Sequence, residues 1–108
     1  MERRISIAAS VLTVVLGLAA CGSAGRQWDT THANEVQKGV HTQQDVRAWF
    51  GEPYTIEPVA GSPLGCVQRW TYTYASSVAG GTTVSDTLVV DFDPQGLVCD
   101  NAYLHQVQ

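Results

Sequence analysis

The stretch that decides the fold is VQRWTYTYASSVAGGTTVSDTLVVDFDPQGLVCDNAYL, residues 67–104. Bulky and small side chains alternate along residues 67–74 and again along 83–92, which is typical of strands with one buried face. Asp93-Pro94-Gln95-Gly96 has proline second and glycine last, and this pattern favours a tight turn followed by a returning strand. The sequence therefore predicts a three-stranded antiparallel meander.

The alternation also assigns the two faces of this sheet. We expect one face to carry the bulky side chains of Trp70, Tyr72, Tyr74, Leu88, Val90 and Phe92. The opposite face is expected to carry Arg69, Thr71, Thr73, Thr87, Val89 and Asp91. Residues 75–82 are small, polar and contain Gly80-Gly81, so they predict a mobile hairpin loop.

Two short helices are expected before the sheet. The first covers residues 31–37, with Gly39 placed to end it. The second follows the capping-box sequence Thr42-Gln43-Gln44-Asp45 and ends at Gly51. Residues 53–65 contain three prolines and two glycines and predict a loop, with at most a short extended piece at 54–57. The expected fold class is α+β, with two helices packed on a three-stranded antiparallel meander in two layers, ααβββ.

The first 21 residues are typical of an export signal. Arg3 and Arg4 precede an uncharged run, residues 5–20, which is shorter than the roughly 20 apolar residues of a membrane span. The run ends in Leu18-Ala19-Ala20-Cys21, which resembles a bacterial lipobox, so Cys21 is the expected acylation site. The alternatives are a retained transmembrane helix, ordinary cleavage beside a free cysteine, or a disulfide role for Cys21.

These features predict three regions and a lipid anchor. Residues 1–20 are the expected signal peptide, 21–30 a flexible tether, and 31–108 the folded domain. From Cys21 onward the net charge is −5, which disfavours nucleic-acid binding and electrostatic attraction to anionic lipid. The acyl chains on Cys21 must therefore supply the membrane attachment.

Cys66 and Cys99 are the only other cysteines, and an exported chain meets an oxidising compartment. We therefore expect them to form a disulfide, the alternative being two free buried thiols. Strands two places apart in a sheet lie about 10 Å from each other, which is too far for a bridge. Cys66 must then curl over the end of the sheet to reach Cys99.

The remaining reactive side chains do not predict an enzyme, a metal site or a cofactor site. His32, His41 and His105 have no metal-ligand spacing and are interpreted as surface or capping residues. Asp91 and Asp93 flank Phe92, and alternation places both on the solvent face. No nucleophile elbow or phosphate-binding glycine loop is present in the sequence.

The face opposite the helices, together with the loop over residues 75–82, is the expected protein-binding surface, because β-branched, weakly charged side chains can be buried against a partner without leaving charges unpaired. Its candidate contact residues are Arg69 and Val89, with Tyr74 as an aromatic anchor at the strand end. Trp28 has two possible roles, either packing onto the domain or lying at the membrane interface.

In the order of its motifs, the chain resembles the SmpA/OmlA (BamE-like) family of small outer-membrane lipoproteins. The family pattern of an apolar residue, Gly, Thr, Val and Leu-Gly-x-Pro is matched by Val36, Gly39, Thr42, Val46 and Phe50-Gly51-Glu52-Pro53. Its Trp-x-Tyr strand and its apolar strand ending in Phe before a glycine turn are matched by Trp70-Thr71-Tyr72 and by residues 88–98. The resemblance covers about residues 34–101. Departures are Phe50 for the usual Leu, a long insertion over residues 57–65, the cysteine pair, and the lack of an extended arm before the first helix.

The resemblance implies a non-catalytic lipoprotein at the outer membrane, facing the periplasm. Its implied partner is an envelope protein, with the outer-membrane β-barrel assembly machine as the candidate, and its role is an accessory in outer-membrane protein assembly or envelope integrity. The fold also resembles the repeats of a secreted β-lactamase inhibitor. The alternative function is therefore an inhibitor-like or substrate-binding module that occludes an enzyme.

Overall fold

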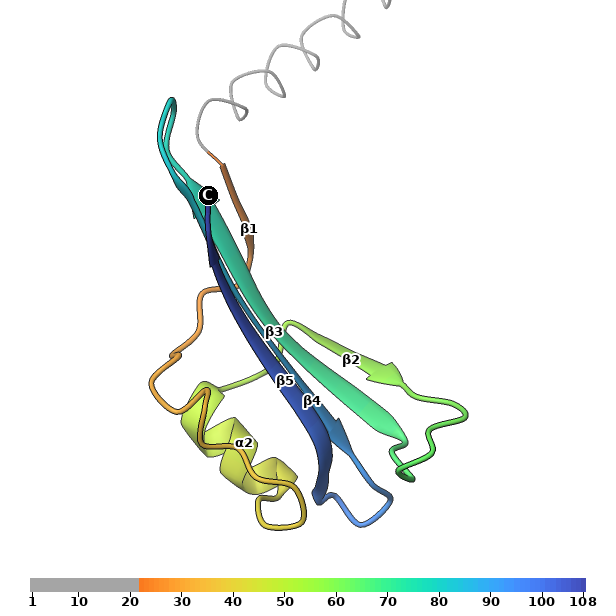
Figure 1. Ribbon diagram of the computed structural model, residues 1–108. Coiled ribbons are helices and arrows are strands. Elements are labelled where there is room, and N and C mark those ends of the chain that lie inside the picture. The colour runs from red at the N-terminus through yellow and green to blue at the C-terminus, as the bar shows by residue number, and fades with distance from the viewer. Residues whose placement is uncertain (1–21) are drawn as a thin grey trace, which may run out of the picture.

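The computed structural model describes residues 22–108, and the expected signal peptide and Cys21 lie outside these residues. One short helix packs against one face of a twisted antiparallel sheet (Figure 1). The elements in chain order are β1 (Gly22–Gly25), α2 (Gln43–Phe50), β2 (Thr55–Pro58), β3 (Gln68–Ser77), β4 (Thr83–Phe92) and β5 (Val98–Val107). The α+β class and the β3–β4–β5 meander are confirmed.

Helix α2 begins and ends as its sequence predicts. The Thr42 hydroxyl accepts a hydrogen bond from the Asp45 backbone nitrogen at 3.2 Å, and the Asp45 carboxylate accepts one from the Thr42 nitrogen at 3.0 Å. This reciprocal pair satisfies two amide groups that have no partner within the helix. Gly51 ends α2 with φ of 81°, a conformation that favours glycine.

The expected helix over residues 31–37 is wrong. The segment forms turns, in which Ala33 donates to the Thr30 carbonyl and Glu35 to the His32 carbonyl. The Asp29 carboxylate accepts bonds from the Thr31 nitrogen and hydroxyl and fixes the first turn. Further bonds tie the segment to β5, because Asn101 donates to the Val36 carbonyl and Gly39 to the Val98 carbonyl. These long-range bonds take the place of helical ones.

The expectation of three strands is also wrong, because β3 carries two further strands along one edge. Strand β2 pairs with residues 68–71 of β3, and β1 pairs with residues 74–77. The extended piece expected at 54–57 corresponds to β2, whereas β1 lies where we expected a flexible coil. Small side chains predict coil locally, but the free edge of β3 supplies backbone partners that override this weak preference.

The core lies between α2 and the lower half of the sheet (Figure 1). Val46 and Phe50 of α2 are buried against Trp70, Tyr72, Leu88, Val90, Phe92 and Val98. Trp28 extends this core, with its ring centroid 5.7 Å from Phe50, 5.8 Å from Tyr72 and 6.0 Å from Tyr103. Of its two possible roles, Trp28 therefore has the packing role.

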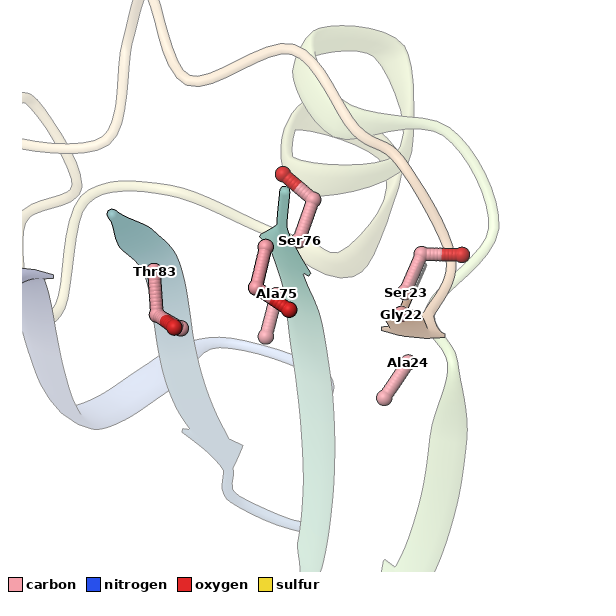
Figure 2. A pocket seen from close by; sticks show the side chains of 7 residues that line it. Gly22, Ser23, Ala24, Ala75, Ser76 and Thr83 are labelled. Carbon is pink, nitrogen blue, oxygen red and sulfur yellow. The ribbon is translucent and has the colours of Figure 1, made fainter. Parts of the chain in front are cut away.

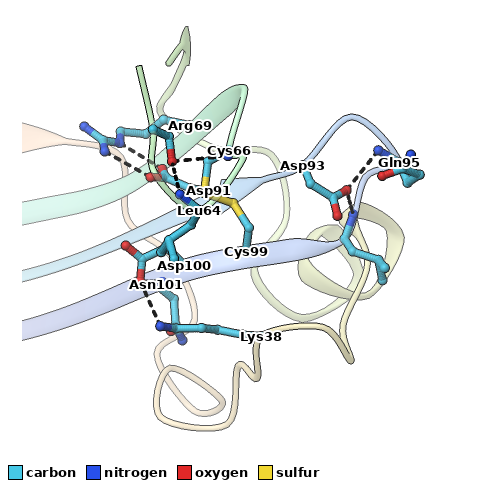
Figure 3. The surroundings of a disulfide bond; sticks show 12 residues. Lys38, Leu64, Cys66, Arg69, Asp91, Asp93, Gln95, Cys99, Asp100 and Asn101 are labelled. Atoms are coloured by element: carbon cyan, nitrogen blue, oxygen red, sulfur yellow. Dashed lines mark hydrogen bonds and ion pairs between the residues drawn. A yellow bond between two sulfur atoms is a disulfide. The ribbon is translucent and has the colours of Figure 1, made fainter. Parts of the chain in front are cut away.

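A disulfide joins Cys66 and Cys99 across the end of β4, with 5.9 Å between their α-carbons (Figure 3). Val67 extends the pairing of β3 with β4 by one residue, because its nitrogen donates to the Phe92 carbonyl, so Cys66 lies just beyond the paired part of the strand. Cys99 lies at a β-bulge, because Asp91 pairs with Asp100 while Phe92 pairs with Val98. The extra residue on β5 breaks the regular spacing and allows its side chain to turn toward Cys66.

Candidate protein-binding surface

The sheet face turned away from α2 is not covered by any helix among residues 22–108, and we call it the open face. Side chains alternate along strands, so the register between strands assigns its members. They form three rows across β3, β4 and β5, which are Arg69–Asp91–Asp100, Thr71–Val89–Ala102 and Thr73–Thr87–Leu104. The surface is charged at the disulfide end and becomes apolar and hydroxylated toward its middle.

The charged row is organised by a two-point ion pair between Arg69 and Asp91 (Figure 3). Arg69 Nε lies 2.8 Å from Asp91 Oδ1, and Arg69 Nη2 lies 3.0 Å from Oδ2. These hydrogen bonds raise the pKa of the Arg69 guanidinium above its ordinary value. The pair fixes the planar guanidinium across the strands, so Arg69 is preorganised rather than mobile.

Asp91 lies on the face opposite the core, as alternation predicts, but its carboxylate is satisfied by Arg69 rather than by solvent. Its side chain is only 7% exposed, and Arg69 covers it. Asp93 instead holds the β4–β5 turn, since its Oδ1 accepts hydrogen bonds from the Gln95 and Leu97 nitrogens at 2.9 and 3.0 Å. Both carboxylates are therefore explained by structural partners within the domain.

A shallow pocket of about 280 Å³ lies on the open face beside this ion pair. It is lined by Arg69, Val89, Asp91, Asp100, Asn101 and Ala102. Lys38 lies 3.4 Å from Asp100 and brings a second cation to that residue (Figure 3). An apolar side chain of a partner could enter over Val89 and Ala102 while its polar atoms meet the paired charges around them.

The three candidate contact residues do not form one surface. Arg69 and Val89 both line the pocket, but Tyr74 lies on the opposite face. Tyr74 has the same parity along β3 as the buried Trp70 and Tyr72, so it is on the helix side and cannot anchor a partner on the open face. The assignment of Tyr74 to that surface is corrected accordingly.

Ala102 and Leu104 are open-face residues that the sequence analysis missed. Counting by twos from the buried Val98 places both in the core. The bulge at Cys99 reverses this parity, so Tyr103 faces the core and Leu104 is 56% exposed. No sequence signal marks the bulge. The expected disulfide between Cys66 and Cys99 does, however, indicate the end of the sheet at which the bulge occurs.

The helix face carries a separate polar cluster around Asp86. The Tyr103 hydroxyl donates to Asp86 Oδ1 at 2.6 Å, His105 Nδ1 contacts the same oxygen, and Trp28 Nε1 donates to the Asp86 carbonyl at 3.4 Å. Burial opposes the charged form of Asp86, but the bonds from Tyr103 and His105 outweigh it and lower the pKa of the carboxylate. Burial, followed by the bond to Asp86, raises the pKa of Tyr103 to about 12.

The other two histidines lie near the surface with local partners. His32 Nδ1 is 3.0 Å from Glu35, and His41 Nδ1 accepts a bond from the Gln37 nitrogen. Both rings also contact Trp49, with centroids 4.8 and 4.6 Å away. Within residues 22–108, no group of three His, Cys, Asp or Glu side chains is arranged to hold a metal ion.

A family model described as the outer membrane protein assembly factor BamE domain matches residues 25–102. The chain belongs to the BamE family. This confirms the resemblance indicated by the motifs over about residues 34–101. The BamE match includes α2, the disulfide and every open-face residue except Leu104.

No curated protein and no solved structure matches the chain. The BamE assignment therefore rests on the family match together with the fold. In the part of the chain that the structure describes, no helix has the length and apolar character needed to cross a membrane.

Proposed function

We propose that this protein is a non-catalytic outer-membrane lipoprotein whose open face binds a protein partner during outer-membrane protein assembly. The observation that carries the proposal is the BamE match over residues 25–102. In the proposed arrangement, acyl chains on Cys21 hold the domain at the periplasmic surface of the outer membrane. The barrel-assembly machine is the partner we propose.

The chemistry of the open face supports a protein as the ligand. Its centre consists of Thr71, Val89 and Ala102, and Leu104 extends the apolar area along β5. Thr73 and Thr87 are hydrogen-bonded to each other at 2.8 Å, so the third row presents mainly their methyl groups and Leu104. A partner would bury this area without leaving an unpaired charge, because Arg69 and Asp91 already satisfy one another.

The test is capture of barrel-assembly components from detergent-solubilised envelopes by wild-type and variant proteins. Leu104→Asp places a charge on the open face at a position that is already exposed, so folding should be unaffected. We expect this variant to capture roughly tenfold less partner, corresponding to the loss of about 1.4 kcal/mol at one contact residue. Val89→Asp tests the same surface beside the pocket.

Ile56→Asp is the matched control, because Ile56 is an exposed apolar residue of the same sheet, 50% accessible to solvent. It pairs with Trp70 and therefore lies on the helix side, away from the open face. Ile56→Asp should capture partner like wild type, and all three variants should keep their thermal melts. Normal capture by both open-face variants would contradict the proposal, and capture of a soluble hydrolase in place of assembly components would favour an inhibitor-like function.

A further inference from the structure

Strand β1 brings the proposed lipid attachment point to one particular end of the domain. Gly22 pairs with Ser77 at the end of β3, and β1 runs antiparallel to β3 (Figure 1). Going from Gly25 back to Gly22 therefore leads toward the β3–β4 turn. Cys21 precedes Gly22 directly, and consecutive α-carbons are about 3.8 Å apart. Little free chain remains between the anchor and the sheet.

Glycine at position 25 is required for this attachment. Gly25 has φ of 84°, and a β-carbon at this position would lie 2.2 Å from the Thr73 carbonyl oxygen. The next residue, Arg26, donates a backbone hydrogen bond of 2.9 Å to the same oxygen. The close approach aligns β1 along β3, and a larger residue at position 25 would push the two strands apart.

The end of the sheet next to Cys21 differs from the rest of the domain in charge. No Asp, Glu, Lys, Arg or His occurs in residues 22–25 or 75–85, although the chain from Cys21 onward has a net charge of −5. The first charged residue along β4 is Asp86, three residues and so about 10 Å along the strand from its start at Thr83. The turn residues 78–82 add further distance between this carboxylate and the bilayer, so the separation exceeds one Debye length at physiological ionic strength and repulsion of the acidic groups by anionic lipid is weakened.

The turn itself is suited to an interface between water and lipid. Val78 is 65% exposed, and Gly81 donates a hydrogen bond of 2.9 Å to the Val78 carbonyl, which satisfies two backbone groups within the turn. A shallow pocket of about 240 Å³ lies at the base of the hairpin, over β1 and the adjoining ends of β3 and β4 (Figure 2). Its uncharged lining of Gly22, Ser23, Ala24, Ala75, Ser76, Ser77 and Thr83 can lie against lipid without burying a charge.

We propose that the β3–β4 turn, residues 78–82, is a membrane-contacting element that lies in the headgroup layer of the bilayer to which Cys21 is acylated. The inference rests on the proposed acylation of Cys21. In place of the flexible tether expected over residues 21–30, β1 gives the domain a fixed orientation, in which the turn touches the bilayer and the disulfide end points away from it. The ligand is the surface of the bilayer itself.

The test uses the full lipidated protein in phosphatidylethanolamine vesicles that contain an anionic phospholipid. With Cys21 acylated and Cys66 bonded to Cys99, Val78→Cys introduces a single free thiol for an environment-sensitive fluorophore. We expect its emission to shift to shorter wavelength and to be quenched by a nitroxide on the lipid headgroup. Leu64→Cys is the matched control, because Leu64 is 56% exposed but lies near the disulfide.

A second variant tests the role of β1. Gly25→Val should detach the strand, so that the label at position 78 loses its quenching and matches the label at position 64. Intact mass is measured on each sample before reconstitution. If the protein is acylated but the label at position 78 is quenched no more than the label at position 64, the membrane contact of the turn is contradicted while the proposed anchor stands. Protein without acyl mass at Cys21 would overturn the proposed anchor and the inference together.

Discussion

At the scale of single residues, Asp86 of β4 joins two separate parts of the chain, the segment before α2 and strand β5. Its carboxylate contacts Tyr103 and His105 of β5, and its carbonyl accepts a hydrogen bond from Trp28. Trp28 comes before α2 in the chain, so one residue of β4 helps to hold the N-terminal segment on the sheet. The polar cluster thus complements the aromatic packing of Trp28 on Phe50 and Tyr72.

We expect the contribution of Asp86 to stability to depend on pH. Because folding lowers the pKa of Asp86, its stabilising effect is present above the unfolded pKa, which is about 3.9, and is lost as pH falls through the lower folded pKa. Asp86→Asn should lower the free energy of unfolding by about 1–2 kcal/mol at neutral pH and by much less in strong acid. Urea denaturation at both pH values measures this difference.

Tyr103→Phe is the companion variant, because it removes one donor to Asp86 and leaves the ring in place. It should reduce the stability difference between neutral and acidic pH only in part. An unchanged pH dependence in Asp86→Asn would show that the carboxylate contributes nothing through its charge.

At the scale of elements, the bulge in β5 has the largest effect on the surface. It moves Cys99 out of the regular alternation and changes which residues of β5 face the core. Without it, Leu104 would be on the helix side and Tyr103 on the open face. The same bulge thus makes the disulfide possible and supplies the open face with Ala102 and Leu104.

The disulfide should be a major source of stability for so small a domain. In the chain-entropy treatment, closing a loop between residues 33 positions apart contributes roughly 3–4 kcal/mol. A double Cys66→Ala, Cys99→Ala variant should therefore unfold at clearly lower urea concentration than wild type. In the wild-type protein, non-reducing peptide mapping should find neither cysteine alkylated, and free modification of both would contradict the bridge.

The elements that could be predicted from sequence are those with strong local patterns. Alternation located β3 and β4, and Thr42 with Asp45 located the start of α2, because these signals act within a few residues. Strand β1 could not be predicted, since Gly-Ser-Ala-Gly has no strand preference and depends on the free edge of β3. The error over residues 31–37 has the same cause, because bonds to β5 replaced local helical bonds.

The candidate surface was predictable in part for a related reason. Arg69 and Val89 were assigned to the correct face because β3 and β4 pair in regular register. Tyr74 was misassigned because alternation places it on the helix side with Trp70 and Tyr72, and β3 continues past it to Ser77. Leu104 depended on a bulge that only the paired structure reveals.

At the scale of the whole molecule, the two ends of the sheet have different chemistry. Ion pairs and the disulfide are concentrated at the end near α2, where Lys38 meets Asp100 and Arg69 meets Asp91. The opposite end, beside β1, has no charged side chain in residues 75–85. With the proposed anchor at Cys21, this polarity would present the charged end of the open face to partners in the periplasm.

The anchor itself is tested by intact mass after extraction of the protein from membranes. The mature chain should begin at Cys21 and carry the added mass of acyl chains, because the charged head, the short apolar run and Leu-Ala-Ala-Cys all indicate lipoprotein processing. Cys21→Ala should remain unacylated and leave the membrane fraction. If that variant were processed and retained like wild type, Cys21 would not be the lipid site.

Strand β1 also determines how the protein would respond to mechanical load. If a large partner held the open face while the acyl chains stayed in the bilayer, tension would run from Cys21 along the axis of β1. Antiparallel hydrogen bonds lie perpendicular to the strands, so this pull would load the bonds between β1 and β3 together, in shear, rather than opening them one after another. Four residues of small side chains would then act as a force-bearing joint between the membrane and the assembly.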